Sequence, residues 1–293
     1  MERSALSAML ARTLFVQGTY VMPSLPLLDP KLDLNFKRLF CDTPDLLIDL
    51  INAVRSDEPP IVELTILNPQ ITPEEIISKL VVLDILARDH LGQLFNIEMQ
   101  TCKHAGWQAR TIYYLARGLG RQLQSGEGYQ QLQPVIGIHL MDFDLFEQEQ
   151  ALWRFELRDH QLPDVLLDRS LQLHLIELPK ADRLHSQVPS ALADGITYLK
   201  HWQEDNLMQQ IDRPAIQKAR QQLQALSADD ELRRLAFVRE RAQRDLATLV
   251  AEAAEAEARG KAEGEISGRA KIATQVRAVA GGHGAAPAKR RRR

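Results

Sequence analysis

The chain has 293 residues, 45% of them hydrophobic and 26% charged, which is typical of a soluble globular protein with one large domain and an appendage, or with two small domains. Its two cysteines, Cys41 and Cys102, lie far apart without CxxC spacing, which argues against a disulfide framework and against a zinc site. The formal net charge is −3 although the last five residues, KRRRR, are all basic, so the overall charge does not favour binding to nucleic acid.

Residues 1–28 are expected to form an irregular N-terminal extension. Their apolar part superficially resembles a signal peptide, but Arg12 interrupts it, so we do not expect secretion. No apolar run in the chain approaches the ~20 residues that a membrane-spanning helix needs. We therefore expect no membrane segment, and the scarcity of cysteine agrees with a reducing, cytoplasmic location.

Residues 29–180 combine helix and strand patterns and are expected to form an α/β core. Apolar side chains recur at helical spacing over residues 44–54, with Thr43 as a suitable N-cap and Pro44 at the first helical position. The near-continuous apolar run PVIGIHLMDF predicts a buried central strand. The run LHLIELPK is interpreted as an edge strand that ends at Pro179. The expected strands cover residues 61–67, 80–89, 93–101, 134–143, 151–159 and 171–178, and a helix is expected within 104–124.

Residues 181–258 are expected to be helical, because this part is rich in Ala, Leu, Glu, Arg and Gln. The helical region is a candidate for self-association into a homo-oligomer. In the tail, residues 259–293, three glycines recur at four-residue intervals, at Gly260, Gly264 and Gly268. Each interior glycine costs a helix about 1 kcal/mol relative to alanine, so we expect a flexible tail with a frayed or partner-dependent helix.

The stretch VVLDILARDHLGQLFNIEMQ, residues 81–100, places acidic residues inside two apolar runs. Burial of a carboxylate in an apolar strand is costly unless another group compensates its charge. A hairpin that is symmetric about Leu91 places Asp84 directly opposite Glu98, and Gln100 shares the face of Glu98 because side chains alternate along a strand. A slip of the register by one residue would move the two acids to opposite faces.

Two facing carboxylates repel each other unless a cation or a proton lies between them. Mg²⁺ binds oxygen ligands, typically one or two carboxylates with waters and a substrate phosphate, so Asp84 and Glu98 are candidate ligands for Mg²⁺ or another divalent ion. Such an ion polarises a phosphodiester and helps to generate a hydroxide nucleophile. Gln100 is a candidate for orienting the attacking water or the phosphate. The alternative is a pair of solvent-facing acids on a half-exposed hairpin, with a polar rim residue at Gln100.

The order of several motifs resembles that of the PD-(D/E)XK nuclease family transposases, also called recombination-promoting nucleases. The motifs are LDLNFKRLF, LLIDLINAV, KLVVLDILARDHLGQLFNIEMQ, RTIYYLARGLGRQLQSGEGYQQLQPVIGIHLMDF and IELPK, followed by EARGKAEGEISGRAK. In this superfamily, an Asp on one hairpin strand and a (D/E)-x-K motif on the next form the site, and members of this family often carry Glu-x-Gln, as in EMQ here. The resemblance covers roughly residues 29–275. The chain departs from the superfamily pattern because no Pro precedes Asp84 and because Gln100 replaces the usual Lys.

The resemblance implies a restriction-endonuclease-like α/β core, with a mixed central sheet flanked by helices, and a helical C-terminal region. It also implies a cytoplasmic DNA endonuclease that depends on Mg²⁺ or a similar ion and acts in recombination or with mobile elements. By position, Asp84 and Glu98 would be metal ligands, and Gln100 would take the place of the catalytic lysine. Asp33 stands where related nucleases often have an accessory acidic residue. Because an amide lacks the positive charge of a lysine, weak activity is one expectation.

Basic residues on the expected helices and strand ends are candidates for contacts with the DNA backbone, although solvated helix faces carry such residues too. Trp107, Tyr113 and Tyr114 are expected in the core rather than stacked on bases. Two other functions remain open: a DNA-binding or oligomerisation module whose site is inactive, and a nuclease that acts on RNA. The candidates for DNA contact are Lys37, Lys103, Arg110, Arg117 and Arg121, with the KRRRR end as a source of non-specific attraction.

Overall fold

The protein is described here by a computed structural model. Most of the expected N-terminal extension, the first part of the strand expected at 80–89 and the KRRRR end lie outside the described residues. The chain divides into two compact units, residues 1–242 and 243–293, and each is described separately. In the first unit, β1 (Phe15–Val16) pairs with β2 (Thr19–Tyr20) as a short antiparallel ribbon. The described residues are 15–16, 19–20, 26–70, 84–103 and 106–281.

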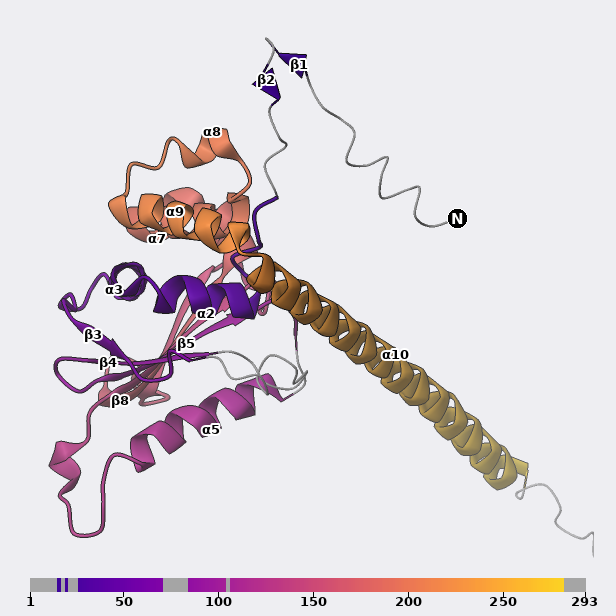
Figure 1. Cartoon of the computed structure of the whole chain (residues 1–293). Helices are drawn as coiled ribbons and strands as arrows, with labels where there is room; N and C mark the ends of the chain where they lie inside the picture. Colours follow the sequence, from indigo (N-terminus) through magenta and orange to yellow (C-terminus); the bar gives the residue numbers. More distant parts are fainter. Residues whose placement is uncertain (1–14, 17–18, 21–25, 71–83, 104–105, 282–293) are drawn as a thin grey trace, which may run out of the picture. The chain divides into compact units, whose positions relative to one another are not determined.

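A mixed sheet lies at the centre of the first unit, and six strands form it among the described residues, in the order β3-β4-β5-β6-β8-β7. Strands β5, β6 and β8 run parallel, whereas the remaining neighbours pair antiparallel. Helices flank the sheet (Figure 1), so the predicted α/β core with a mixed sheet is confirmed. The strands are β3 (Leu64–Ile66), β4 (Ile85–Asp89), β5 (Leu94–Gln100), β6 (Val135–Met141), β7 (Leu152–Arg158) and β8 (Leu166–Glu177).

The β4–β5 hairpin has the register that a turn symmetric about Leu91 predicts. Ile85 pairs with Ile97, and Leu86 pairs with Asn96. Because side chains alternate along a strand, this register directs every second residue of β5 to the core and the others to the opposite face. The prediction of the register is therefore confirmed over the paired residues of the two strands.

The turn of this hairpin fixes the register. The backbone N–H of Asp89 donates a hydrogen bond of 3.1 Å to the carbonyl oxygen of Gln93. The Oδ1 atom of Asp89 accepts hydrogen bonds from the backbone N–H groups of Leu91, at 3.0 Å, and of Gln93, at 2.8 Å. Gly92 has a φ of 87°, in the left-handed region that glycine adopts at little steric cost. The Asp and Gly of the DHLGQ turn therefore have separate structural roles.

Strand β6 is buried along its whole length, as predicted for a central strand. Strand β8 is not the edge strand that the sequence suggested: it lies between β6 and β7, and β7 forms the edge of the sheet. Its C-terminal half, from Gln172 to Glu177, is buried, which explains why LHLIE lacks a polar face. The strand ends at Glu177, and Pro179 lies in the first turn of α6 (Leu178–Arg183), where a helix does not need its N–H.

Helices α2 (Asp33–Cys41) and α3 (Pro44–Val54) cover one face of the sheet (Figure 1). Helix α3 has the predicted bounds, with Thr43 at the N-cap position and Pro44 first in the helix, although the Thr43 side chain makes no capping hydrogen bond. The apolar residues of both helices pack on the apolar side of the sheet in one core. This core includes Phe36, Leu39, Leu47, Ile51, Phe95, Ile97 and Ile138.

The same core continues into the helices that follow the sheet. Ile196 of α7 (Ser190–His201) and Leu223 of α9 (Pro214–Ala228) are buried in it, and so is Ala236, near the start of α10 (Asp230–Gly281). The region expected at residues 181–258 therefore packs, as far as Ala236, in one core with the sheet. Among its described residues, the first unit also has the short helices α6 and α8 (Asp205–Met208) and the 3-10 turns Tyr129–Gln131 and His185–Gln187.

Helix α5 (Trp107–Gly120) lies on the opposite face of the sheet (Figure 1). Leu115 of this helix packs in a second, smaller core beside Val135. Gly118 permits this close approach, because a Cβ atom there would lie 3.2 Å from Cγ1 of Val135. The face that α5 covers is the one that carries the polar residues of β5.

Helix α10 runs from Asp230 to Gly281, and its first residues belong to the first unit. The described part of the second unit is the remainder of this helix, which continues through Gly260, Gly264 and Gly268. In the part of the chain that the structure describes, no helix combines the length and the apolar character of a membrane span.

Candidate functional site

Asp84 lies directly before β4, and the side chain of Asn68 holds its backbone. The Asn68 amide donates a hydrogen bond of 3.2 Å to the carbonyl oxygen of Asp84, and its Oδ1 accepts one of 2.7 Å from the N–H of Leu86. The side chain thus continues the β3–β4 ladder after the bond from the N–H of Leu67 to the carbonyl of Leu86. Sequence reasoning missed Asn68, whose sole signal is a polar residue just after an expected strand.

The Asp84 carboxylate lies on the polar face of β5. Its Oδ2 accepts a hydrogen bond of 2.7 Å from Nδ2 of Asn96. Asn96, Glu98 and Gln100 alternate along β5 and therefore share one face. Asp84 thus lies on the same face as Glu98. Asn96 was also missed in the sequence, where its signal is the two-residue spacing from Glu98.

Glu98 is buried, and three polar side chains surround its Oε2 atom. Gln100 donates a hydrogen bond of 2.8 Å to this oxygen from Nε2. His139, which is paired with Glu98 on the neighbouring strand β6, places Nδ1 at 3.7 Å from it. Arg110 of α5 places Nη2 at 4.0 Å. The residues of the EMQ motif therefore contact each other rather than open solvent.

Burial raises the pKa of both acids. For Asp84, burial has the largest effect and the negative charge of Glu98 adds to it, whereas the charge of Lys37 and the hydrogen bond from Asn96 lower the pKa. For Glu98, burial again has the largest effect, and the charge of Arg110 opposes it. Two acids with raised pKa values, Glu98 buried and Asp84 half-buried, form a pair whose charge a cation would compensate.

His139 does not provide that compensation. Its side chain is buried, and burial together with the charge of Arg110 lowers its pKa to about 3. Trp107 packs edge-on against the ring, with the ring centroids 5.5 Å apart. The imidazole is therefore neutral near pH 7, and it does not balance the charge of Glu98.

The donor set suits a divalent ion that prefers oxygen ligands, such as Mg²⁺. Asp84 and Glu98 offer carboxylate oxygens on one face, and Asn96 and Gln100 add amide oxygens beside them. The described residues contain no cluster of three or more His, Cys, Asp or Glu side chains placed for a metal ion. Mg²⁺ commonly uses one or two carboxylates and keeps waters for its other positions, so the pair is a sufficient protein contribution.

Two of the basic residues predicted to contact DNA lie beside the acids. Arg110 approaches Glu98, and Lys37 is close enough to Asp84 for its charge to act on that carboxyl. Lys37 is only 1% exposed. Lys103 is exposed just after β5, with Nζ 5.7 Å from the centroid of the Phe143 ring.

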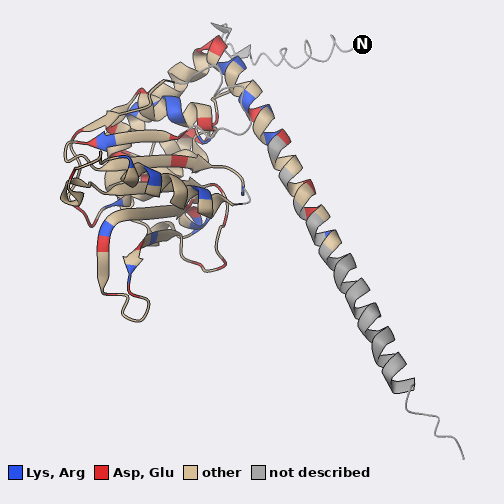
Figure 2. Ribbon diagram, turned by 90° about the horizontal axis from the view of Figure 1, so that it is seen from below, with Lys and Arg blue, Asp and Glu red and all other residues tan. Residues whose placement is uncertain are grey.

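A cavity of about 300 Å³ extends from Asp84 along the polar side of the hairpin to α5. Arg117, Arg121 and Tyr114 line it on the helix side. The segment Trp107–Arg121 contains three arginines and no acidic residue. Figure 2 shows Lys and Arg positions, in blue, on the side of the first unit from which α5 is seen. This side therefore offers positive charge close to the two acids.

The aromatic residues of α5 do not all lie in the core. Trp107 is 5% exposed, as predicted, but Tyr113 is 58% exposed and Tyr114 is 49% exposed. The prediction of a core position is wrong for the two tyrosines, because the helix directs Thr111 and Leu115 to the sheet instead. The two tyrosine rings contact each other, with their centroids 5.4 Å apart.

Asp33, the predicted accessory acid, forms a buried ion pair. Nε of Arg239, in α10, donates to both of its oxygens, at 3.1 and 3.0 Å, and both side chains are almost fully buried. The backbone N–H of Leu34 donates a further hydrogen bond of 2.8 Å to Oδ1. The structure thus gives Asp33 a partner of its own, and its role in catalysis stays a prediction.

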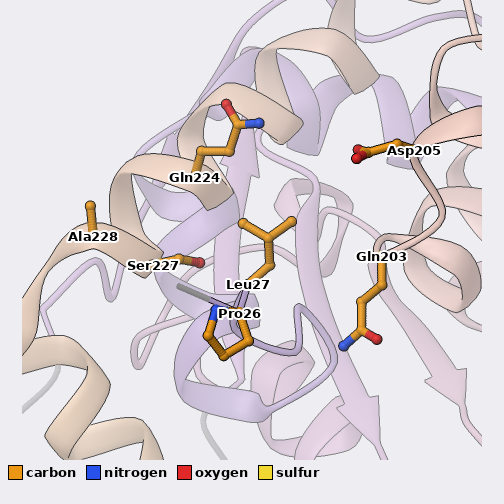
Figure 3. Close-up of a pocket in the computed structure, with 7 residues that line it drawn as sticks. All are labelled: Pro26, Leu27, Gln203, Asp205, Gln224, Ser227 and Ala228. Atoms are coloured by element: carbon orange, nitrogen blue, oxygen red, sulfur yellow. The ribbon is translucent and has the colours of Figure 1, made fainter. Parts of the chain in front are cut away.

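A larger cavity, about 600 Å³, lies elsewhere in the first unit (Figure 3). It is formed by the segment at Pro26 and Leu27, the start of α8 and the end of α9. Two of its polar groups are already paired: Ser227 accepts a hydrogen bond from Leu28 N–H at 2.9 Å, and Asp205 contacts Arg220 at 3.4 Å. This cavity is larger, but among the described residues no pair of acids or other reactive group lines it. The hairpin therefore remains the candidate site.

Comparison with known proteins gives one match. The sequence model of a family described as PD-(D/E)XK nuclease family transposase matches residues 30–253. No curated protein matches the chain significantly, and no solved structure does. The matched residues include the hairpin, α5 and the ion pair between Asp33 and Arg239.

Proposed function

Because the chain belongs to the PD-(D/E)XK nuclease family transposases, we propose that it is a metal-dependent endonuclease that hydrolyses phosphodiester bonds of DNA in recombination or in the movement of mobile elements. Membership of the family supports a nuclease. The DNA substrate, the attack within a strand and the dependence on Mg²⁺ are parts of the proposal.

The observation that carries the proposal is the placement of Asp84 and Glu98. They lie on one face of the β4–β5 hairpin, burial raises the pKa of both, and the charge of Glu98 raises that of Asp84 further. A buried and a half-buried acid on one face lower the stability of the protein unless the pair binds a cation or a proton. Acids with perturbed pKa values are typical of functional sites.

In the proposed reaction, Asp84 and Glu98 hold the divalent ion. When bound, this ion supplies Lewis acidity toward the phosphate and a lowered pKa for water. Asn96 holds the Asp84 carboxylate in place, and Gln100 orients the attacking water or a phosphate oxygen. Arg110 balances the charge of Glu98.

The DNA strand is proposed to approach from the side of α5. Arg117 and Arg121 line the cavity that reaches Asp84, and no acidic residue of α5 opposes them. Phosphate contacts from arginine position a strand without reading its sequence. The exposed rings of Tyr113 and Tyr114 are suited to stacking on bases that are not paired.

Cleavage of supercoiled plasmid tests the proposal, because a closed circle has no end for an exonuclease. Wild-type protein is expected to nick or linearise it with Mg²⁺ and to leave it intact with EDTA. Asp84→Asn and Glu98→Gln are expected to be inactive. Asp164→Asn and Glu147→Gln, at exposed positions away from the hairpin, serve as matched controls and are expected to cut like wild type.

Cleavage that persists in EDTA, or in Asp84→Asn, would contradict the metal-nuclease proposal. Plasmid that is bound tightly but never cut would indicate a DNA-binding module with an inactive site. Cleavage of a structured RNA but not of plasmid would assign the same chemistry to RNA.

A further inference from the structure

Resting on the nuclease function proposed above, we propose that the ammonium group of Lys37 contacts the scissile phosphate and supplies, from helix α2, the positive charge that the lysine of the (D/E)-x-K motif supplies in the wider superfamily. In this chain Gln100 occupies the position of that lysine on the strand. The charge would thus be retained at the site although its position in the sequence has changed.

The burial of Lys37 is the first observation. The side chain is 1% exposed, and Nζ has no hydrogen-bond partner among the residues that the structure describes. Lysine is almost never fully buried unless it is paired, because removing an ammonium group from water costs several kcal/mol. A fully buried lysine that has no hydrogen-bonding partner in the described part of the chain is suited to an anionic ligand that arrives later.

The location of Lys37 is the second observation. Helix α2 packs against β5, and the charge of Lys37 acts on the carboxyl of Asp84. Asp33, one helical turn earlier and on the same side of α2, is held by Arg239. Lys37 forms no comparable ion pair among the described residues, and its charge acts on Asp84, one of the two acids proposed to hold the divalent ion.

Arg110 is the other cation near the acids; its Nη2 is buried and makes no hydrogen bond among the described residues, but it forms an ion pair with Glu98. Its Nη2 lies 4.0 Å from Oε2 of Glu98, and a third of its side chain is exposed. Gln100 lacks a charge, and its Nε2 is used in the hydrogen bond to Glu98. Lys37 combines a charge with the absence of both an ion pair and a hydrogen bond among the described residues, which neither Arg110 nor Gln100 does.

The proposed contribution of Lys37 is electrostatic. The water oxygen forms a bond to phosphorus while the bond from phosphorus to the leaving sugar oxygen breaks. The attacking water releases its proton to bulk water, and the leaving oxygen takes one from bulk water. Negative charge grows on the phosphate during this step, and an ammonium group held in place stabilises it without exchanging a proton.

The test removes the positive charge at position 37 and restores a lysine at position 100. Four proteins are compared: wild type, Lys37→Met, Gln100→Lys and the double variant Lys37→Met with Gln100→Lys. For each we measure the rate of single-turnover plasmid cleavage with Mg²⁺, the affinity for the same plasmid in EDTA and the melting temperature. Arg38→Ala is the matched control, because Arg38 lies on the same helix but is partly exposed and pairs with Asp42 at 3.2 Å.

Lys37→Met is expected to slow cleavage by about 100-fold or more, the usual effect of losing one transition-state contact, while plasmid affinity changes less than about threefold. The double variant is expected to regain at least about tenfold, and Arg38→Ala to cut like wild type. A merely structural role for Lys37 would not produce rescue by a lysine on another element.

Lys37→Met that cuts within about threefold of wild type overturns the inference and leaves the proposed nuclease function standing. A wild-type protein that does not cut with Mg²⁺ overturns both. If Lys37→Met does not fold, cleavage by the double variant tests the inference. Cleavage by this variant supports it, and a double variant that folds but does not cut overturns it.

Discussion

The side-chain amide of Gln100 donates a 2.8 Å hydrogen bond to Oε2 of Glu98, so the residue in the lysine position stabilises its neighbouring acid. Both side chains are buried. A lysine at position 100 would bring a charge to this place, whereas the amide brings a fixed dipole. The hydrogen bond lowers the pKa of Glu98 against the effect of burial, which favours the ionised form that a metal ion requires.

Gln100→Leu removes this donor and leaves a buried oxygen of Glu98 with one partner fewer. We expect the free energy of unfolding in EDTA to fall by about 1 to 2 kcal/mol, because an unsatisfied buried acceptor retains its desolvation penalty. Urea denaturation followed by circular dichroism measures it. Gln221→Leu, at an exposed position of α9, is the control and is expected to change stability by less than about 0.5 kcal/mol. Equal effects of the two substitutions would contradict the prediction.

Asp84→Asn is expected to separate stability from activity. The change removes one of two like charges and keeps the shape of the side chain, so we expect the metal-free protein to gain roughly 1 kcal/mol of stability while cleavage is lost. Thermal unfolding in EDTA and plasmid cleavage with Mg²⁺ are compared for this variant and for Asp164→Asn. A variant that is both less stable and inactive would indicate that Asp84 has a structural role.

The ion pair between Asp33 and Arg239 predicts a loss of stability. Arg239→Ala leaves a buried carboxylate without its partner, so we expect a loss of about 3 to 5 kcal/mol in the free energy of unfolding. The exposed pair of Lys218 and Asp45, at 2.6 Å, provides the control: Asp45→Ala should cost less than about 1 kcal/mol. If Asp33 acts in catalysis as well, Asp33→Asn should lower the cleavage rate per folded molecule, measured after correction for the folded fraction.

His174 predicts how stability depends on pH. Burial is the main cause that lowers its pKa to about 4, and the charges of Arg154 and Arg55 lower it further, whereas Asp57 and Glu156 oppose them. Between pH 6.5 and 4, His174 is protonated in the unfolded chain, where its pKa is 6.5, but it stays neutral in the folded protein. Its contribution to stability is therefore complete above pH 6.5 and is lost progressively down to pH 4.

The size of this effect is about 3 kcal/mol for a shift from 6.5 to about 4. Urea denaturation at several pH values should show a shallower acid limb for His174→Gln than for wild type. His160→Gln, at an exposed position, should follow the wild-type curve. Parallel curves for His174→Gln and wild type would show that the imidazole does not cause the loss.

Arg117 and Arg121 predict a salt-dependent affinity for DNA. Each phosphate contact that is lost should reduce the slope of log affinity against log salt concentration by about 0.9. Fluorescence anisotropy with a labelled duplex, at a series of salt concentrations, measures the slope for Arg117→Ala and Arg121→Ala. Arg234→Ala, at an exposed position of α10, is expected to leave it unchanged. An unaltered slope in both helix variants would indicate that DNA does not bind along α5.

The hairpin could be predicted from the sequence because its information is local. The turn at Asp89 and Gly92 sets the register, and the two-residue period then assigns each side chain of β5 to a face. The same period places Asn96 on the polar face as well, but this residue was missed because apolar residues flank it in the sequence. The contact between Asn96 and Asp84 depends on the rotamers of both side chains, which the period does not specify.

Residues from distant parts of the chain could not be placed in this way. Lys37 and Asp33 are charged residues on a short helix, where solvent exposure is the usual outcome. Their burial depends on Arg239 and on the packing of the helices over the sheet, which no local pattern reveals. For β8, the sequence shows burial but not the order of strands, so its position inside the sheet was missed.

The ion pair between Asp33 and Arg239 joins residues that are 206 positions apart. A ribosome makes the chain from its N-terminus, so α2 and the whole sheet emerge while the arginine is still missing. Until it is made, Asp33 either stays in water or is buried without a counterion. The buried pair can therefore close only late in synthesis, after both acids of the hairpin have been made.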